Sequence, residues 1–264
     1  FFLILFCAKI ISFKFKLALL ITIFGFFSIG FLDDYLSIKK QINLGLKSKE
    51  KLILQIFFSS FFVIFLFNNN LINNNPIFFN DLTINLKNLI IPLSIVTIIS
   101  LSNSVNLTDG LDGLAAGCSS IVFCGLGTEI ILNNDKSYLI FSLLSFCMSG
   151  LCLGFLKHNK YPAKIFMGDT GSLTIGAIIG IICVVTNSFF TTFIISGIFV
   201  IEALSVILQV IYFKITKKLN KQGKRLFLMT PIHHHFELGG IKEEKIVEIF
   251  WLINIILIIF SIVM

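Results

Sequence analysis

The chain has 264 residues, of which 56% are hydrophobic and 31 are phenylalanine, and its formal net charge is +7. This composition excludes a soluble globular domain, because such domains are less apolar and do not carry many long apolar runs. Several runs here reach the roughly 20 apolar residues that cross a bilayer core as a helix. We therefore expect an all-α, polytopic membrane bundle that forms a single domain over residues 1–264.

The apolar runs predict eight full membrane helices. Their expected ranges are 17–32, 52–67, 89–105, 114–132, 138–156, 172–187, 192–213 and 247–264. Residues 1–12 resemble the tail of a further helix, and because the chain starts with Phe rather than Met we expect an N-terminal part to be missing. No basic segment or cleavage site precedes the first run, so a signal peptide is not predicted.

The lysines and arginines predict how the bundle is oriented. One set of alternating loops holds 16 of the 21 basic residues, and these loops are 33–51, 106–113, 157–171 and 214–246. Short cytoplasmic loops of membrane proteins carry an excess of Lys and Arg, so we expect this set to face the cytoplasm. The polar clusters capable of chemistry all fall in the same four loops, which predicts one composite site on the cytoplasmic face.

Asp33 and Asp34 are adjacent carboxylates where the first full helix is expected to end. Two like charges at a membrane surface require a cation, a nearby lysine or protonation to offset their repulsion. They are interpreted either as a solvated helix-end pair or as a magnesium-binding or general-base pair that faces a phosphate. The lysines that follow are expected to anchor the chain on anionic lipid, with one or two holding diphosphate. They are Lys39, Lys40, Lys47, Lys49 and Lys51.

The loop from Asn106 to Gly113 contains two Asp-Gly units, Asp109-Gly110 and Asp112-Gly113. A tight two-residue hairpin is not plausible between membrane helices, so turn formation alone explains this loop poorly. We interpret it as a nucleoside or metal site. If the next helix begins at Leu111, Asp109 and Asp112 are expected to share one helical face.

A third cluster surrounds Asp169, which lies between Gly168 and Gly171 and follows several lysines. Glycines let backbone amides approach a ligand closely, and a carboxylate is a hard oxygen ligand for a cation. The pattern fits an anionic substrate that arrives with magnesium. The alternative is an ordinary turn beside lysines that only reflect membrane orientation.

The last cluster is His233-His234-His235, which follows a basic run at 214–225. Three consecutive side chains cannot all point the same way on regular secondary structure. No cysteine cluster accompanies them, which disfavours a zinc site and favours phosphate contacts or proton transfer near neutral pH. All six cysteines lie within apolar runs, and neither a disulfide nor a metal is predicted from them.

Two carboxylates, Glu129 and Glu202, fall inside predicted membrane helices. A carboxylate there is either functional or part of a hydrogen bond between helices. The glycine pairs 150/154 and 176/180 have the spacing that allows helices to approach closely, and we expect both pairs to pack against neighbouring helices.

Four segments together resemble the polyprenyl-phosphate N-acetylhexosamine-1-phosphate transferases. They are Phe31–Tyr35, Asn106–Ala115, Tyr161–Ser172 and Pro231–Glu237. The histidine triplet favours the phospho-N-acetylmuramoyl-pentapeptide transferase branch over the relatives that use N-acetylglucosamine phosphate. The resemblance implies transfer of phospho-MurNAc-pentapeptide from UDP to undecaprenyl phosphate, with Mg²⁺, to give lipid I and UMP in peptidoglycan synthesis. It also implies a bacterial cytoplasmic-membrane enzyme that contacts membrane lipid, binds no nucleic acid and forms a homodimer.

The resemblance also implies roles for particular residues. Asp169 corresponds to the magnesium ligand, Asp33 and Asp34 to the catalytic pair, and the histidine triplet to a motif lining the diphosphate region. The residues expected around the uridine-diphosphate pocket are Asn106, Asp109, Gly110, Leu111, Asp112, Asn159 and Phe166, with Lys49 and Gln209 as further substrate contacts. Which member of the aspartate pair acts as base, and whether the reaction passes through a covalent phospho-enzyme, stay open.

The chain departs from the family pattern at Ser37, where a basic residue is usual, and Lys39 or Lys40 is the expected substitute. Two other functions remain as alternatives. One is a sibling transferase that uses another UDP-sugar. The other is a transporter that uses Glu129 and Glu202, which predicts carboxylates deep in the bilayer and helices broken at mid-membrane.

Overall fold

The computed structural model describes residues 12–41, 45–71, 77–79, 82–84, 89–133 and 136–263. The helices in these ranges are α2 (Phe13–Lys40), α3 (Ser48–Asn68), α4 (Ile90–Thr108), α5 (Leu114–Leu132), α6 (Leu139–Asn159), α7 (Gly168–Thr186), α8 (Phe189–Ile195), α9 (Gly197–Asn220), α10 (Ile232–Leu238) and α11 (Glu243–Val263). A short 3-10 helix, η2, covers Lys136–Tyr138. Two three-residue strands, β1 (Ile77–Phe79) and β2 (Leu82–Ile84), pair antiparallel.

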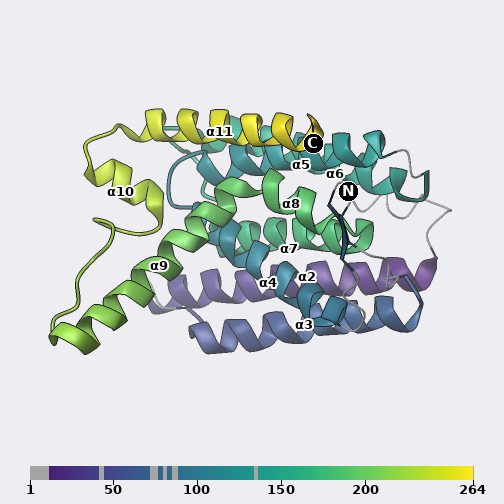
Figure 1. Cartoon of the computed structure of the whole chain (residues 1–264), viewed down its shortest axis with the longest axis horizontal. Helices are drawn as coiled ribbons and strands as arrows, with labels where there is room; N and C mark the ends of the chain where they lie inside the picture. The colour runs from purple at the N-terminus through teal and green to yellow at the C-terminus, as the bar shows by residue number, and fades with distance from the viewer. Residues whose placement is uncertain are drawn as a thin grey trace.

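The prediction of a polytopic helical bundle is confirmed. Among the described residues, eight helices are long and apolar enough to cross a membrane. Most of them lie side by side along the long axis of the molecule, whereas α9 runs diagonally and ends at the lower left of the view, away from α10 (Figure 1). The predicted helical tail at residues 1–12 falls outside the described residues apart from Ser12, whose hydroxyl accepts a hydrogen bond from the N–H of Phe15 at the start of α2. Cys7 also falls outside them, and the other five cysteines are free thiols.

The predicted span at 192–213 is wrong in one respect, because the helix is interrupted. The segment begins as α8, stops at Ser196 and resumes as α9 at Gly197. Adjacent serine and glycine are a recognised cause of sharp helix bends, since both are weak helix formers. The hydropathy of the run is continuous through this point, so it carries no sign of the interruption.

Helix α2 is longer than predicted, and Asp33 and Asp34 lie inside it rather than at its end. The helix stops at Gln41, which adopts a left-handed conformation (φ 52°) and donates its N–H to the carbonyl of Ile38. Hydropathy detects burial in lipid, whereas a helix continues as long as its backbone bonds and side-chain contacts are satisfied. The extra turns carry the two aspartates out to the end of the bundle.

Close packing places α7 between α2 and α4. A Cβ added at Gly180 would lie 2.7 Å from Cα of Ile98, and one at Gly176 would overlap the backbone of α4, so the packing prediction for this pair is confirmed. A Cβ at Gly30 of α2 would overlap the backbone of Asp169. The prediction is wrong for Gly150 and Gly154, because no described atom lies within 4 Å of a Cβ at either position.

Candidate active site

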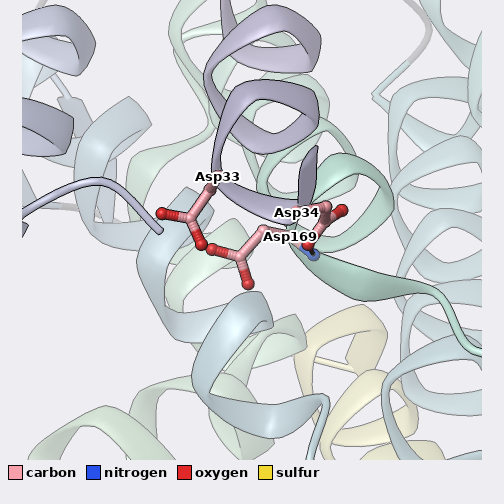
Figure 2. A group of neighbouring side chains, drawn as sticks. All are labelled: Asp33, Asp34 and Asp169. Atoms are coloured by element: carbon pink, nitrogen blue, oxygen red, sulfur yellow. Dashed lines mark hydrogen bonds between the residues drawn. The ribbon is translucent and has the colours of Figure 1, made fainter. Parts of the chain in front are cut away.

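Three carboxylates, which we call the carboxylate cluster, meet at the end of the bundle: Asp33 and Asp34 of α2 and Asp169 of α7. One oxygen from each lies within 4.8 Å of the others. Asp33 is buried, the other two are half-buried, and the side chains of Asp33 and Asp169 point toward one another (Figure 2). The prediction that these three residues lie together is therefore confirmed, although Asp34 and Asp169 are 135 positions apart in the sequence. Gly30 makes the approach possible, since any larger residue there would push α2 away from α7.

Lys51, in the first turn of α3, lies between two members of this cluster. Its Nζ is 3.1 Å from Oδ1 of Asp33 and 2.5 Å from Oδ2 of Asp169. A single ammonium therefore offsets part of the repulsion between the carboxylates. Sequence reasoning singled out Lys49 instead, which is exposed.

A signal for Lys51 was present in the helical spacing. Gln55 is a polar residue in an apolar run and lies one turn after Lys51, so the two share a helix face. Gln55 is buried, and its Oε1 accepts a hydrogen bond from Nδ2 of Asn103 at 2.8 Å. That face therefore points into the bundle, as a site residue requires.

Asp34 has a different task from Asp33. Its carboxylate accepts hydrogen bonds from the N–H groups of Asp169 (3.1 Å) and Thr170 (2.9 Å) and from the Thr170 hydroxyl. The first N–H groups of a helix lack intrahelical partners and favour a negative charge, so Asp34 caps α7 from another helix. Gly168 begins α7 at φ 65°, and a Cβ there would lie 2.8 Å from Oδ2 of Asp34, so glycine is required on both counts.

The carboxylates of Asp33 and Asp169 are held by further amide donors. The N–H of Leu46 donates to Oδ1 of Asp33 at 2.7 Å. The side-chain amide of Asn106 donates to Oδ1 of Asp169 at 2.8 Å and to the hydroxyl of Ser172 at 2.9 Å. Asn106 was predicted to contact substrate, and the structure places it as an orienting partner of Asp169.

Asp109 follows α4 directly and is coupled to the cluster by charge. Burial raises the pKa of its carboxyl to about 7, and the negative charges of Asp169 and Asp34 add to this effect, while a hydrogen bond from the backbone of Gly168 opposes it. Proximity to like charges and loss of water both disfavour the ionised form. The site therefore holds more negative charge than its one bridging lysine offsets.

Asp112 was expected to share a helical face with Asp109, and this is wrong. Helix α5 begins only at Leu114, so residues 109–113 are not helical. The carboxylate of Asp112 accepts from the N–H of Ala163 at 2.8 Å, and its own N–H donates to Glu243 at 2.7 Å. Asp112 therefore ties its loop to the segment before α7 and to α11.

Asn159 performs the same task from α6. It is buried, its Oδ1 accepts from the N–H of Gly113 at 3.2 Å, and its Nδ2 donates to the carbonyl of Ile165 at 2.9 Å. Leu111 is also buried, within the hydrophobic core. Phe166, by contrast, is 76% exposed, so of these three predicted substrate residues it is the one open to a ligand.

The histidine triplet lies on the short helix α10, and each imidazole has a different partner, as expected for consecutive residues. The Nδ1 atoms lie 3.0 Å from Oε1 of Glu202 for His233, 2.9 Å from Oε2 of Glu237 for His234, and 3.2 Å from the donating N–H of Leu228 for His235. His233 is buried, whereas the other two are half-buried and remain open to a ligand. The open question about Glu202 is settled in favour of a contact between helices.

Gln209 of α9 was predicted to contact substrate, but its amide is occupied by the chain. Its Oε1 accepts from the N–H groups of Leu226 (2.8 Å) and Phe227 (3.0 Å), and its Nε2 donates to the carbonyl of Phe227. These bonds fold the segment after α9 back along that helix. The effect of Gln209 is to position the approach to α10.

An apolar pocket of about 360 Å³ lies between α4, α7, α8 and α9. Its lining includes Ser100 and Ser104 of α4, Phe193 of α8 and Leu204 of α9. Ser104 lies one turn before the end of α4 at Thr108, so the pocket extends along α4 toward the end of the bundle that holds the carboxylate cluster. A polar reaction centre next to an apolar pocket suits a substrate with a charged head and a hydrocarbon tail.

Comparison with known proteins shows which family the chain is similar to. Residues 16–187 match the model of glycosyl transferase family 4. The chain is 63% identical over 240 residues to a phospho-N-acetylmuramoyl-pentapeptide-transferase of Prochlorococcus marinus strain MIT 9515, covering 91% of the chain and 66% of that protein. It is 62% identical to the protein of that name from strain MIT 9301 (93% and 69% covered) and 40% identical to the one from Synechococcus sp. strain CC9605 (94% and 71% covered). The chain thus spans about two thirds of the length of these relatives.

Proposed function

The chain belongs to glycosyl transferase family 4, and from this premise we propose that it transfers phospho-N-acetylmuramoyl-pentapeptide from UDP to undecaprenyl phosphate. The products are lipid I and UMP. Relatives at 60–63% identity carry the name of this activity. We place the reaction at the cytoplasmic face of a bacterial membrane, because 16 of the 21 lysines and arginines fall in the loops on the side of the carboxylate cluster.

The observation that carries the proposal is the carboxylate cluster with Lys51 at the end of the bundle. The reaction brings a phosphate nucleophile against a diphosphate, so both partners are anions. Catalysis of such a transfer depends on cations and on positioning rather than on covalent chemistry by many side chains. A half-buried cluster of carboxylates with excess negative charge is suited to recruit a divalent cation for this purpose.

The residues present fit Mg²⁺, which prefers hard oxygen ligands and is bound through one or two carboxylates together with substrate phosphates. Asp169 would hold it, together with an oxygen of Asp33 or Asp34. When bound, Mg²⁺ neutralises charge on the diphosphate. Asp34 already accepts three hydrogen bonds from α7, which leaves Asp33 as the freer member of the pair.

The side chains around the carboxylate cluster are proposed to have different roles in the transfer. Asp33, buried beside Lys51, is suited to take a proton from the attacking phosphate or to orient it. Lys51 supplies a fixed positive charge between the two carboxylates and the incoming anions. Asn106 keeps the carboxylate of Asp169 in one orientation, and half-buried His234 and His235 border the same end of the bundle.

The acceptor's hydrocarbon chain is assigned to the apolar pocket beside α9, because the pocket is lined mostly by apolar side chains of helices that are long enough to span a membrane and it reaches Ser104 near the end of α4. A transporter would use the broken span at Ser196 and the buried Glu202. Here Glu202 is instead joined to His233 of the histidine triplet, at the same end as the carboxylate cluster.

The proposal is tested with purified protein, undecaprenyl phosphate and magnesium. We expect UMP release and a lipid-linked product with UDP-MurNAc-pentapeptide, and little with UDP-GlcNAc. Release only with UDP-GlcNAc would assign the chain to the sibling transferases. No release with either sugar, from protein that is folded by circular dichroism, would reject the transferase proposal.

A further inference from the structure

Glu202 and His233 form a buried pair that the reaction scheme above does not use. Glu202 lies on α9 and His233 on α10, and both side chains are 0% exposed. The Nδ1 of the imidazole is 3.0 Å from Oε1 of the carboxylate. A carboxylate buried without a partner is costly, so this contact is required for Glu202 to be where it is.

The second polar atom of each side chain has no partner among the described residues. These atoms are Oε2 of Glu202 and Nε2 of His233. A carboxylate oxygen accepts, so the short contact makes Nδ1 of the imidazole the donor. The hydrogen bond made by one ring nitrogen decides whether the other nitrogen carries a proton. Nε2 is therefore the ring nitrogen of His233 that faces away from Glu202.

Nε2 of His233 is directed at the loop that carries Asp109. A Cβ built at Gly110 would overlap Nε2 and would lie 2.9 Å from Cε1 of the same ring. The imidazole thus rests against the backbone of Gly110, and the ring of His234 lies next to it with centroids 4.2 Å apart. Glycine is needed at 110 because of this contact and not because of its own backbone conformation.

The chain of contacts runs from α9 to the carboxylate cluster. Glu202 holds His233, His233 rests on Gly110, and the neighbouring Asp109 interacts with the backbone of Gly168 at the start of α7. On α9, the residues that follow Glu202, Ala203 and Leu204, line the apolar pocket. The pair therefore joins the pocket-lining helix to the loop beside Asp169.

We propose that Glu202 is a positioning residue, which holds His233 with Nδ1 protonated and Nε2 against Gly110 and thereby fixes the Asp109 loop beside the carboxylate cluster. The importance of this for turnover rests on the proposed transferase function. The contact itself is a property of the folded protein and is measurable without substrate.

The direct test uses ¹⁵N-histidine labelling, because the chain has only four histidines. The signals of His233 are assigned with the His233→Gln variant. We expect wild-type His233 to carry its proton on Nδ1, and Glu202→Leu to change the protonation pattern or broaden the His233 signals while those of His158 stay in place. An unprotonated Nδ1 in the wild type would mean that Glu202 donates, and it would overturn the proposal.

The kinetic arm uses three variants measured for UMP release. Loss of a residue that orients a functional histidine typically lowers activity about 10–100-fold, and we expect this loss in kcat for Glu202→Leu with the KM for undecaprenyl phosphate nearly unchanged. Glu202→Gln keeps a side-chain oxygen acceptor and should retain part of the activity. A Glu202→Leu variant that folds normally and keeps the kcat of the wild type would overturn the proposal.

Glu129→Gln is the matched control. Glu129 is also a buried carboxylate within a membrane helix, one of its oxygens accepts from Asn133 at 2.8 Å, and the other has no partner among the described residues. We expect its kcat to stay within about twofold of wild type, since it does not touch the histidine triplet. A wild type that is inactive with every UDP-sugar would reject the transferase function, while the histidine signals would still decide for or against the Glu202 contact.

Discussion

Two polar centres lie at the same end of the molecule, and they differ in exposure and in the number of carboxylates that they bring together. The carboxylate cluster joins three half-buried or buried aspartates to one lysine. Glu202 and His233 form a one-to-one pair that is completely buried. Water and ions can reach the first centre, so it can exchange a cation, whereas burial of the second leaves it able only to hold its neighbours in place. Exposure and the number of carboxylates thus distinguish the proposed reaction centre from the proposed positioning contact.

The largest expected effect is a loss of turnover that tests whether the carboxylate cluster binds a cation. Asp169→Asn keeps the shape of the side chain and removes its charge, and we expect UMP release to fall about 1000-fold or more. Folding should persist, because the one oxygen of the amide can still accept from either Asn106 or Lys51, which bond to different oxygens of Asp169 in the wild type. Glu248→Gln, at an exposed carboxylate on α11, serves as the control and should be active. Normal turnover of Asp169→Asn at ordinary magnesium would remove Asp169 from the metal site.

The next effect concerns the bridging lysine. Lys51→Met removes the only ammonium that contacts the cluster in the described part of the chain, and we expect about a 100-fold loss of turnover. The unpaired carboxylates should then repel each other, so added Mg²⁺ should raise the Tm of the variant more than that of the wild type. Lys245→Met, at an exposed lysine of α11, is the control. Equal Mg²⁺ shifts in variant and wild type would show that Lys51 does not balance the cluster.

A smaller effect tests the contact between the buried pair and the Asp109 loop. Gly110→Ala should place a methyl group against Nε2 of His233 and lower stability by about 1–3 kcal/mol, which is typical of overpacking. Adding His233→Ala should relieve the clash, so thermal unfolding of the double variant should show non-additivity. Gly154→Ala has no described neighbour within 4 Å and should be neutral or slightly stabilising. Strictly additive losses at 110 and 233 would argue against the contact.

The last effect concerns stability alone and is a pH dependence from Asp109. Its pKa is raised to about 7 by burial and by the charges of Asp169 and Asp34, so the folded state binds a proton that the unfolded state has released. The free energy of unfolding is therefore highest, as far as this group is concerned, below its unfolded pKa near 4, and it falls as the pH rises toward 7. Asp109→Asn does not titrate, so its Tm relative to wild type should rise over this range. A difference that does not change between pH 5 and pH 8 would contradict the raised pKa.

Much of the fold followed from hydropathy alone. Each of the eight apolar runs overlaps a described helix that is long and apolar enough to cross a membrane, although the run at 192–213 is split between α8 and α9. The range 114–132 was predicted as observed. The bounds failed where polar residues continue a helix, as at Asp33 and Asp34 in α2, because hydropathy does not report helix length beyond the lipid. The break at Ser196 and the short helix α10 were missed for a related reason, since neither changes the local hydropathy enough to be seen.

The sequence predicted which residues lie at the candidate site better than it predicted what each of them contacts. Asp33, Asp34 and Asp169 do come together, and Asn106 contacts Asp169. Three other predicted substrate residues instead form hydrogen bonds to the backbone through their side chains: Asp112, Asn159 and Gln209. A polar side chain beside a site looks the same in sequence whether it faces a ligand or a neighbouring loop.

The sequence by itself determined that this is a helical membrane protein and which loops carry the candidate site, because apolar run length and the spacing of charges are local properties. Only the tertiary structure decided that Lys51 rather than Lys49 bridges the carboxylates, that Asp34 caps α7, and that Glu202 holds His233 against Gly110. These contacts join residues far apart in the chain, and they form only when glycines such as Gly30 let helices approach closely enough for side chains from different helices to meet.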